Sequence, residues 1–254
     1  MNPNNNISWK RLFVEAFAIV ASILFAFAID AWWEDRLERN EERNSLELIL
    51  RDLQESEEQL NRYALYAASA SQSGIDAYMA LSSSGPYDRE TIRNDMMRVD
   101  RYSVRVPKAA YTEILSTGRL RVIADRALRD HIVQFYENAE RSELIILKNN
   151  DAYLDRLLGD SYYASGLLLP YSAEDMRVAS ITSANQLLLE RIGTEFQHLP
   201  DPMWDFPADS REWQKLRSAL LYAAQIHILG ELNAKRMINE ASLLADEIEH
   251  WLAR

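Results

Sequence analysis

Residues 12–29 read LFVEAFAIVASILFAFAI, eighteen residues in which Glu15 carries the only charge. An apolar run of about 18 residues or more is long enough for a helix to cross the hydrocarbon core of a bilayer. The run lies between Trp9 and the pair Trp32 and Trp33, and tryptophans are enriched at membrane–water interfaces. The sequence therefore predicts one membrane-spanning helix, with these three tryptophans as its interface anchors and the lipid bilayer as a partner.

A cleaved secretory signal is the alternative interpretation of this segment. Lys10 and Arg11 would be its charged region, and Ala26 and Ala28 would form a small-x-small cleavage site. Residues 30–62 contain no glycine or proline, so we expect the helix to continue unbroken out of the membrane, where a signal would end in extended chain. The predicted organisation is a tail over 1–11, a transmembrane helix over 12–31 and an extramembrane α-helical domain over 32–254.

One face of the predicted span is small and polar. Steps of three and four residues place on it a single set of side chains: Glu15, Ala18, Ser22, Ala26 and Asp30. Small residues let two helices approach closely in lipid, so this face predicts a helix–helix interface, although alanine is common enough for chance to explain it. Glu15 lies four residues after Arg11, which favours an ion pair near the interface over a proton relay.

The composition of the whole chain favours helices and excludes several classes of site. There are 254 residues, with seven glycines, seven prolines and no cysteine, so disulfides and thiolate metal sites are excluded. The net charge of −11 argues against a nucleic-acid partner. The predicted fold class is all-α: an N-terminal transmembrane helix continuing into a long helix, followed by an antiparallel helical bundle.

Helical periodicity gives the expected elements after the membrane. The first helix should continue to about Leu81, with short helices over 88–102 and from Ala109, the latter closed by Gly118 in the left-handed conformation. A helix from about Asp125 to Gly159, another over 173–196 and a loop over 199–207 follow. The last helix, over 210–252, has an unbroken apolar stripe whose small centre, including Gly230 and Ala234, predicts a close helix crossing, with Asn233 facing outward.

The exit from the span resembles that of a known family. Glu15, the apolar run and the sequence Ile29-Asp30-Ala31-Trp32-Trp33-Glu34-Asp35-Arg36 are similar to an uncharacterised bacterial family of short single-pass membrane proteins. A middle segment also resembles that family, through Tyr111, Leu115, Ser116, Gly118, Leu120, Ile123, Leu128, Phe135 and Tyr136. The resemblance implies the bacterial cytoplasmic (inner) membrane, a cytoplasmic N-terminus and an extracytoplasmic C-terminal domain. It implies no activity.

The motif Glu-x-x-His occurs twice, as Glu195 with His198 and as Glu247 with His250. Two such pairs on facing helices can hold two metal ions in a helical bundle. Here His198 precedes Leu199-Pro200 at a helix end and His250 is close to the carboxyl terminus, so a di-metal site is only a remote alternative. No phosphate-binding loop or nucleophile elbow occurs in the sequence, and we expect neither an enzyme nor a cofactor.

Three functions remain open at this point. The first is a membrane-anchored helical scaffold or interaction protein, as a homo-oligomer or with another membrane protein. The second is an extracytoplasmic sensory or ligand-binding bundle, in which Tyr162, Tyr163 and Tyr171 would line a pocket. The third is the di-metal carboxylate enzyme. His227, on the stripe of the last helix, is expected to be a packed core histidine.

Overall fold

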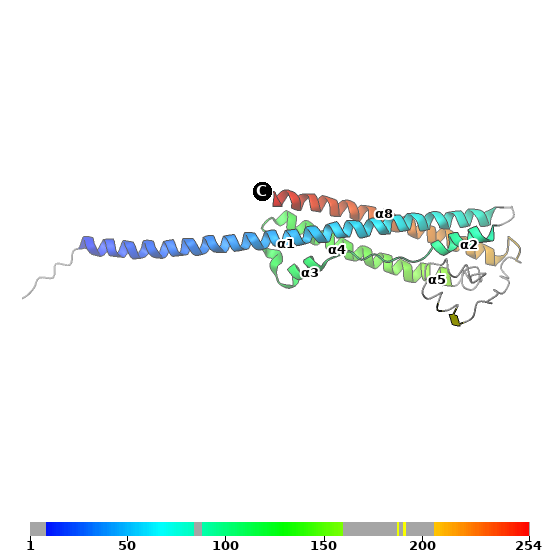
Figure 1. The fold of residues 1–254 in the computed structure, drawn as a ribbon, viewed down its shortest axis with the longest axis horizontal. Helices are drawn as coiled ribbons and strands as arrows, with labels where there is room; N and C mark the ends of the chain where they lie inside the picture. Colours follow the sequence, from blue (N-terminus) through cyan, green and yellow to red (C-terminus); the bar gives the residue numbers. More distant parts are fainter. Residues whose placement is uncertain (1–8, 84–87, 160–186, 188–189, 192–205, 254) are drawn as a thin grey trace, which may run out of the picture. The chain divides into compact units, whose positions relative to one another are not determined.

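The computed structural model describes residues 9–83, 88–159, 187, 190–191 and 206–253, and these form helices joined by short non-helical segments (Figure 1). No strand occurs among them, so the all-α prediction is confirmed. The chain divides into two compact units. Unit 1 contains residues 1–52, 108–133 and 244–254, and unit 2 contains residues 53–107 and 134–243.

Helix α1 (Trp9–Ser82) is 74 residues long and ends within one residue of the position expected from the sequence. Its apolar residues after the predicted span recur every three, four or seven positions, and they are buried: Leu46, Ile49, Leu53, Leu60, Tyr63, Ala67 and Ala70. Because no glycine or proline interrupts residues 30–62, nothing in that stretch breaks the backbone hydrogen-bond ladder.

In unit 1, two acidic side chains of α1 hold the segments that follow it in space. Asp52 accepts a hydrogen bond from the amide of Ala110, 2.9 Å away, in the first turn of α3 (Ala109–Ser116). Glu42 accepts from the amide of Ala124, 2.7 Å away, between the 3-10 helix η1 (Arg119–Val122) and α4 (Arg126–Asn149). These amides lie at helix starts, where no intrahelical acceptor exists, so the two carboxylates satisfy them.

Gly118 follows α3 with φ of 71° and begins η1, as the sequence predicted for a left-handed cap. The start of α4 and the end of α8 (Arg211–Leu252) complete unit 1, where Nδ1 of His131 lies 2.8 Å from a carboxylate oxygen of Glu247. At the end of α8, the carbonyl of Leu252 accepts a hydrogen bond from the Arg43 guanidinium, 3.3 Å away.

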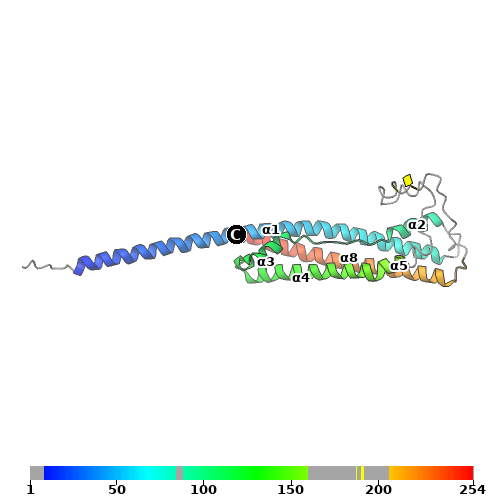
Figure 2. The same cartoon turned by 90° about the horizontal axis from the view of Figure 1, so that it is seen from below.

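In unit 2, stretches of α1, α4 and α8 lie side by side with α2 (Arg89–Arg98) and α5 (Asp155–Leu158), as Figures 1 and 2 show. Helix α8 runs antiparallel to the other two. Along α1, Gly74 meets Ala224 and Leu81 meets Arg217 of α8. Along α4, Asn138 bonds to Glu240 and Ser142 bonds to Asn233 of α8. Helices α1 and α4 run in the same direction, because the extended segment 99–107 returns between them.

The core of unit 2 is apolar and comes mainly from α1, α2 and α8: Ala77, Leu81, Ile92, Met96, Val99, Leu154, Trp213, Leu216, Leu220, Ala223 and Ile226. Helix α2 starts at an Asp88 cap, whose side chain accepts from the Thr91 amide. Helix α1 approaches α8 closely at Gly74, where a Cβ would lie 3.3 Å from the Cβ of Ala224 and 3.4 Å from the carbonyl oxygen of Leu220. Small residues are needed there because the two backbones meet.

The crossing predicted at Gly230 exists, but a tyrosine fills it. The ring of Tyr63 on α1 lies so close to Gly230 that a Cβ there would overlap the phenolic oxygen. Ala234, one turn later, is 1 % exposed. The outward position expected for Asn233 is wrong, because this half-buried side chain accepts a hydrogen bond from Ser142 on α4.

The helix expected from Asp125 to Gly159 contains a π-helical turn, η2 (Asn150–Leu154), between α4 and α5. A π-helix bonds i to i+5 and so shifts the following residues around the axis. Leu154 is therefore buried and Tyr153 is 42 % exposed, whereas an uninterrupted three-four stripe through Leu128, Ile132, Phe135, Ala139 and Ile146 predicts from the sequence that Tyr153 is buried. The expected helix over 173–196 and most of the loop over 199–207 lie outside the described residues.

Candidate functional site

The first part of α1 is the clearest candidate for function, since it is apolar and has no described element packed on it. Within α1, an 18-residue window has a mean hydropathy of 2.1 and contains no buried residue. Phe17 is 71 % exposed and Leu24 is 63 % exposed, and both views show this part of α1, in blue, extending alone from the rest of unit 1 (Figures 1 and 2). One described helix is thus long and apolar enough to cross a membrane.

The predicted interface anchors lie at the two ends of this segment and are all exposed. The exposed fraction is 82 % for Trp9, 54 % for Trp32 and 57 % for Trp33. The Trp32 and Trp33 rings are tilted against each other with centroids 6.4 Å apart, and the Arg36 guanidinium lies 5.7 Å from the centre of the Trp32 ring. A cation over an indole face is a favourable arrangement at an exposed site.

The small, polar face of the predicted span is also exposed along its length: Glu15, Ala18, Ser22, Ala26 and Asp30. The Ser22 hydroxyl donates to the carbonyl of Ala18 at 2.7 Å, a bond within one helix turn. This backbone bond satisfies the hydroxyl without a partner helix. Small side chains are therefore exposed along this face, and its role as a helix–helix interface stays a prediction.

The two halves of the remote metal motif differ in what the structure describes. Glu247 lies on α8 with Oε2 at 2.8 Å from Nδ1 of His131, and His250 is exposed one turn from the end of α8. Glu195 and His198 lie outside the described residues. Among the residues that are described, no three acidic or histidine side chains gather closely enough to hold a metal ion.

A polar and aromatic cluster in unit 2 surrounds the extended segment 99–107. The Tyr66 hydroxyl donates to the carbonyl of Asp100 at 2.6 Å, and its ring stacks on Tyr102 with centroids 4.7 Å apart. The Tyr63 ring also contacts Tyr102, with centroids 5.9 Å apart and the rings tilted. Burial raises the pKa of Tyr63 to about 12 and also raises the pKa of Tyr66, so both rings stay neutral at neutral pH.

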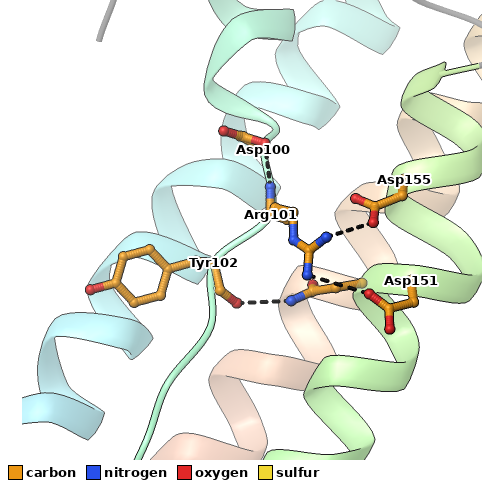
Figure 3. Close-up of polar contacts among 6 residues, drawn as sticks. Asp100, Arg101, Tyr102, Asp151 and Asp155 are labelled. Carbon is orange, nitrogen blue, oxygen red and sulfur yellow. Dashed lines mark hydrogen bonds and ion pairs between the residues drawn. The ribbon is translucent and has the colours of Figure 1, made fainter. Parts of the chain in front are cut away.

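The same segment is tied to the π-helical turn by an ion-pair network (Figure 3). Arg101 pairs with Asp155 at 2.6 Å and with Asp151 at 3.3 Å. Asn150, which is 3 % exposed, donates from Nδ2 to the carbonyl of Tyr102 at 3.1 Å. Asn150 and Asp151 belong to the π-turn itself, so this turn and the segment 99–107 hold each other in place.

His227 on α8 borders the polar and aromatic cluster and is 3 % exposed, as expected for a core histidine. Its ring meets Tyr66 edge to face at 5.9 Å, and its Nε2 atom has no hydrogen-bond partner among the described residues. Burial lowers the pKa of His227 to about 4, although the nearby Asp100 carboxylate acts in the opposite direction. The imidazole is therefore neutral at neutral pH.

Sequence reasoning missed the network around Arg101, because nothing in the local pattern pairs a residue at 101 with acids fifty positions later. The pocket expected from Tyr162, Tyr163 and Tyr171 lies outside the described residues. In the comparisons with known proteins, no family model, curated protein or solved structure matches this chain. The resemblance to a single-pass membrane family thus stays an expectation.

Proposed function

We propose that the protein is a membrane-anchored helical scaffold, in which the first part of α1 crosses a bilayer and the helical units assemble with other chains. One observation carries this proposal. An 18-residue window near the start of α1, with mean hydropathy 2.1, has none of its residues buried. About fifteen exposed apolar side chains in water would be strongly unfavourable, and a bilayer removes that cost.

The continuity of α1 favours an anchor over a cleaved signal. Cleavage after Ala28 would cut inside a helix that runs without a break from Trp9 to Ser82. A helix of 74 residues is about 110 Å long, of which a bilayer core takes about 30 Å. The remaining length is available to the two helical units, so one element both anchors and builds the protein.

We propose the bacterial cytoplasmic membrane as the location, with the N-terminus in the cytoplasm and the C-terminal helices outside. Lys10 and Arg11 precede the apolar segment, and basic residues are retained on the cytoplasmic side of a span. Arg36, Arg39 and Arg43 follow it, so the local excess of basic residues is small and the resemblance to the single-pass family adds the remaining support.

Fractionation of cells that produce the full chain tests the anchor. We expect the protein in the membrane fraction, resistant to alkaline carbonate and released by mild detergent. The matched control lacks residues 1–31 and should be soluble with its helix content retained. Release of the full chain by carbonate would contradict the proposal.

A reporter that fluoresces only in the cytoplasm, fused after Arg254, tests the orientation. We expect a dark fusion, because the carboxyl terminus would be outside the cytoplasm. The same reporter fused before Met1 is the control and should be bright. A bright carboxyl-terminal fusion in the membrane fraction would reverse the orientation and leave the anchor intact.

A further inference from the structure

The small, polar face of the predicted span continues along α1 beyond the span, and no described helix packs on this continuation. Ala26, Asp30, Trp33, Leu37, Asn40 and Asn44 recur at alternating spacings of four and three residues, and all six are exposed. Alternation of three and four is the heptad spacing of a coiled-coil seam. Trp33 and Leu37 are its large apolar members, with exposed fractions of 57 % and 48 %.

This seam lies opposite the face of α1 that packs in unit 1. Leu37 and Leu46 are nine residues apart, about two and a half helical turns, so they point in opposite directions from the axis. Leu46 and Ile49 are fully buried and Glu42 is 4 % exposed, whereas Asn40 and Asn44 remain exposed beside them. Packing of unit 1 therefore leaves the seam free.

From this geometry we infer that the seam pairs with the same seam of a second copy of the chain, as a short parallel coiled coil just outside the membrane. This inference rests on the proposed function, because two spans inserted with one orientation can bring their seams together only in parallel. The occupant is a second copy because the charges flanking the seam complement one another across such a pair.

The charge complementarity is specific to the parallel, in-register arrangement. In this heptad frame Arg36 occupies position g and Glu41, five residues later, occupies the next position e. Residues at g and at the following e′ face each other in a parallel two-stranded coiled coil, so Arg36 of each copy meets Glu41 of the other. In the structure of one chain both side chains are exposed and therefore accessible to such a partner.

The asparagines fix the number of strands and the register. Asn44 occupies an a position, where a buried asparagine pair favours two strands in register at some cost in stability. Asn40 follows the same seam at a d position. With two large apolar residues and two asparagines, the stalk alone would pair weakly, so we expect the dimer to depend on the two spans being held in one bilayer.

Disulfide cross-linking in membranes tests the inference without background, because the chain has no cysteine. Leu37→Cys and Asn44→Cys place a thiol on the seam, and Asp35→Cys and Arg39→Cys place an exposed thiol on the opposite side of the same helix. We expect several-fold more cross-linked dimer from the two seam variants under a mild oxidant. Equal yields from both sides would overturn the inference.

The charges give a second, independent readout. Arg36→Glu in the Leu37→Cys background should lower the dimer yield several-fold, because it opposes two acids on each side of the seam. Adding Glu41→Arg should restore the yield. Failure of this rescue would overturn the register. If the protein also leaves the membrane in carbonate, the anchor itself has failed; if it stays in the membrane while both faces cross-link equally, only the dimer seam has failed.

Discussion

The first part of α1 and the whole of α8 are both long, breaker-poor helices rich in apolar residues, yet they place those residues differently. In α8 the buried apolar side chains follow one stripe, from Trp213 through Leu220 to Ile248, while polar groups occupy much of the remainder. In residues 12–29 apolar side chains surround the axis and every described one is exposed. The distribution of apolar residues around a helix, more than their number, decides whether protein or lipid covers it.

Charged residues introduced into residues 12–29 should have the largest effect, because they oppose insertion of this segment into a bilayer. Val20→Arg combined with Leu24→Arg puts two guanidinium groups at the middle of the proposed span, at a cost of roughly 2.5 to 3.5 kcal/mol each. We expect the protein to move from the membrane fraction to the soluble or aggregated fraction. Glu34→Arg with Glu38→Arg, outside the apolar run, is the matched control and should stay in the membrane.

The free energy of unfolding should depend on pH because His227 is buried in the stripe of α8. Its pKa is about 4 in the folded chain and about 6.5 when exposed, so the unfolded chain takes up a proton first as pH falls. Between pH 6.5 and 4 the free energy of unfolding should fall by about 1.4 kcal/mol per pH unit from this group, roughly 3 kcal/mol in all. Urea titrations across this range measure the slope.

His227→Gln removes that titration and should flatten the slope over the same range. The control is His131→Gln, which changes an exposed histidine on α4. An unchanged slope in His227→Gln would show that the acid sensitivity comes from other groups, including the Asp100 carboxylate that faces His227.

A larger side chain in the buried stripe of α8 should lower the free energy of unfolding. Ala234→Leu adds volume at a position that is 1 % exposed, and overpacking of this kind costs about 1 to 3 kcal/mol of unfolding free energy. Asn239→Leu, at an exposed position of the same helix, is the control and should change little. Thermal unfolding of both variants provides the comparison; equal small shifts would mean that Ala234 is not in the core.

The smallest effect should come from the exposed network at Arg101. Arg101→Gln breaks two ion pairs of a side chain that is 40 % exposed, and pairs of this kind are worth about 0.2 to 1 kcal/mol each. Arg98→Gln is the control, because Arg98 lies 4.0 Å from Asp95, at the outer limit of an ion pair. High salt should shrink the difference between the two variants, and a difference that persists unchanged in salt would argue for packing.

Much of the helical layout could be predicted because its signals are local. The Asp88 cap, the left-handed Gly118 and the three-four stripe of α8 each depend on neighbouring residues and the helical period. The end of α1 follows from the serine-rich stretch after it, and the start of α8 follows from the proline-rich stretch before it. The same logic correctly placed His227 in the core.

The errors and omissions come from contacts between distant parts of the chain. Nothing near Gly230 indicates that Tyr63 would fill the space beside it, and nothing near Asn233 indicates the hydrogen bond from Ser142. Tyr153 was misplaced because a constant period of 3.6 residues fails at the π-turn. The interface predicted for Glu15, Ala18, Ser22, Ala26 and Asp30 depends on a partner chain and stays a prediction.

The π-turn also changes which side chains of the helix formed by α4, η2 and α5 face the rest of unit 2. The wider turn changes the direction in which its own residues and the following ones point, so Leu154 enters the core and Asp151 and Asp155 face Arg101. Removing Asn150, the first residue of the turn, would rotate the residues that follow by about 100° and move all three away together. A single-residue deletion there would thus displace several side chains at once, whereas most point substitutions nearby alter one contact at a time.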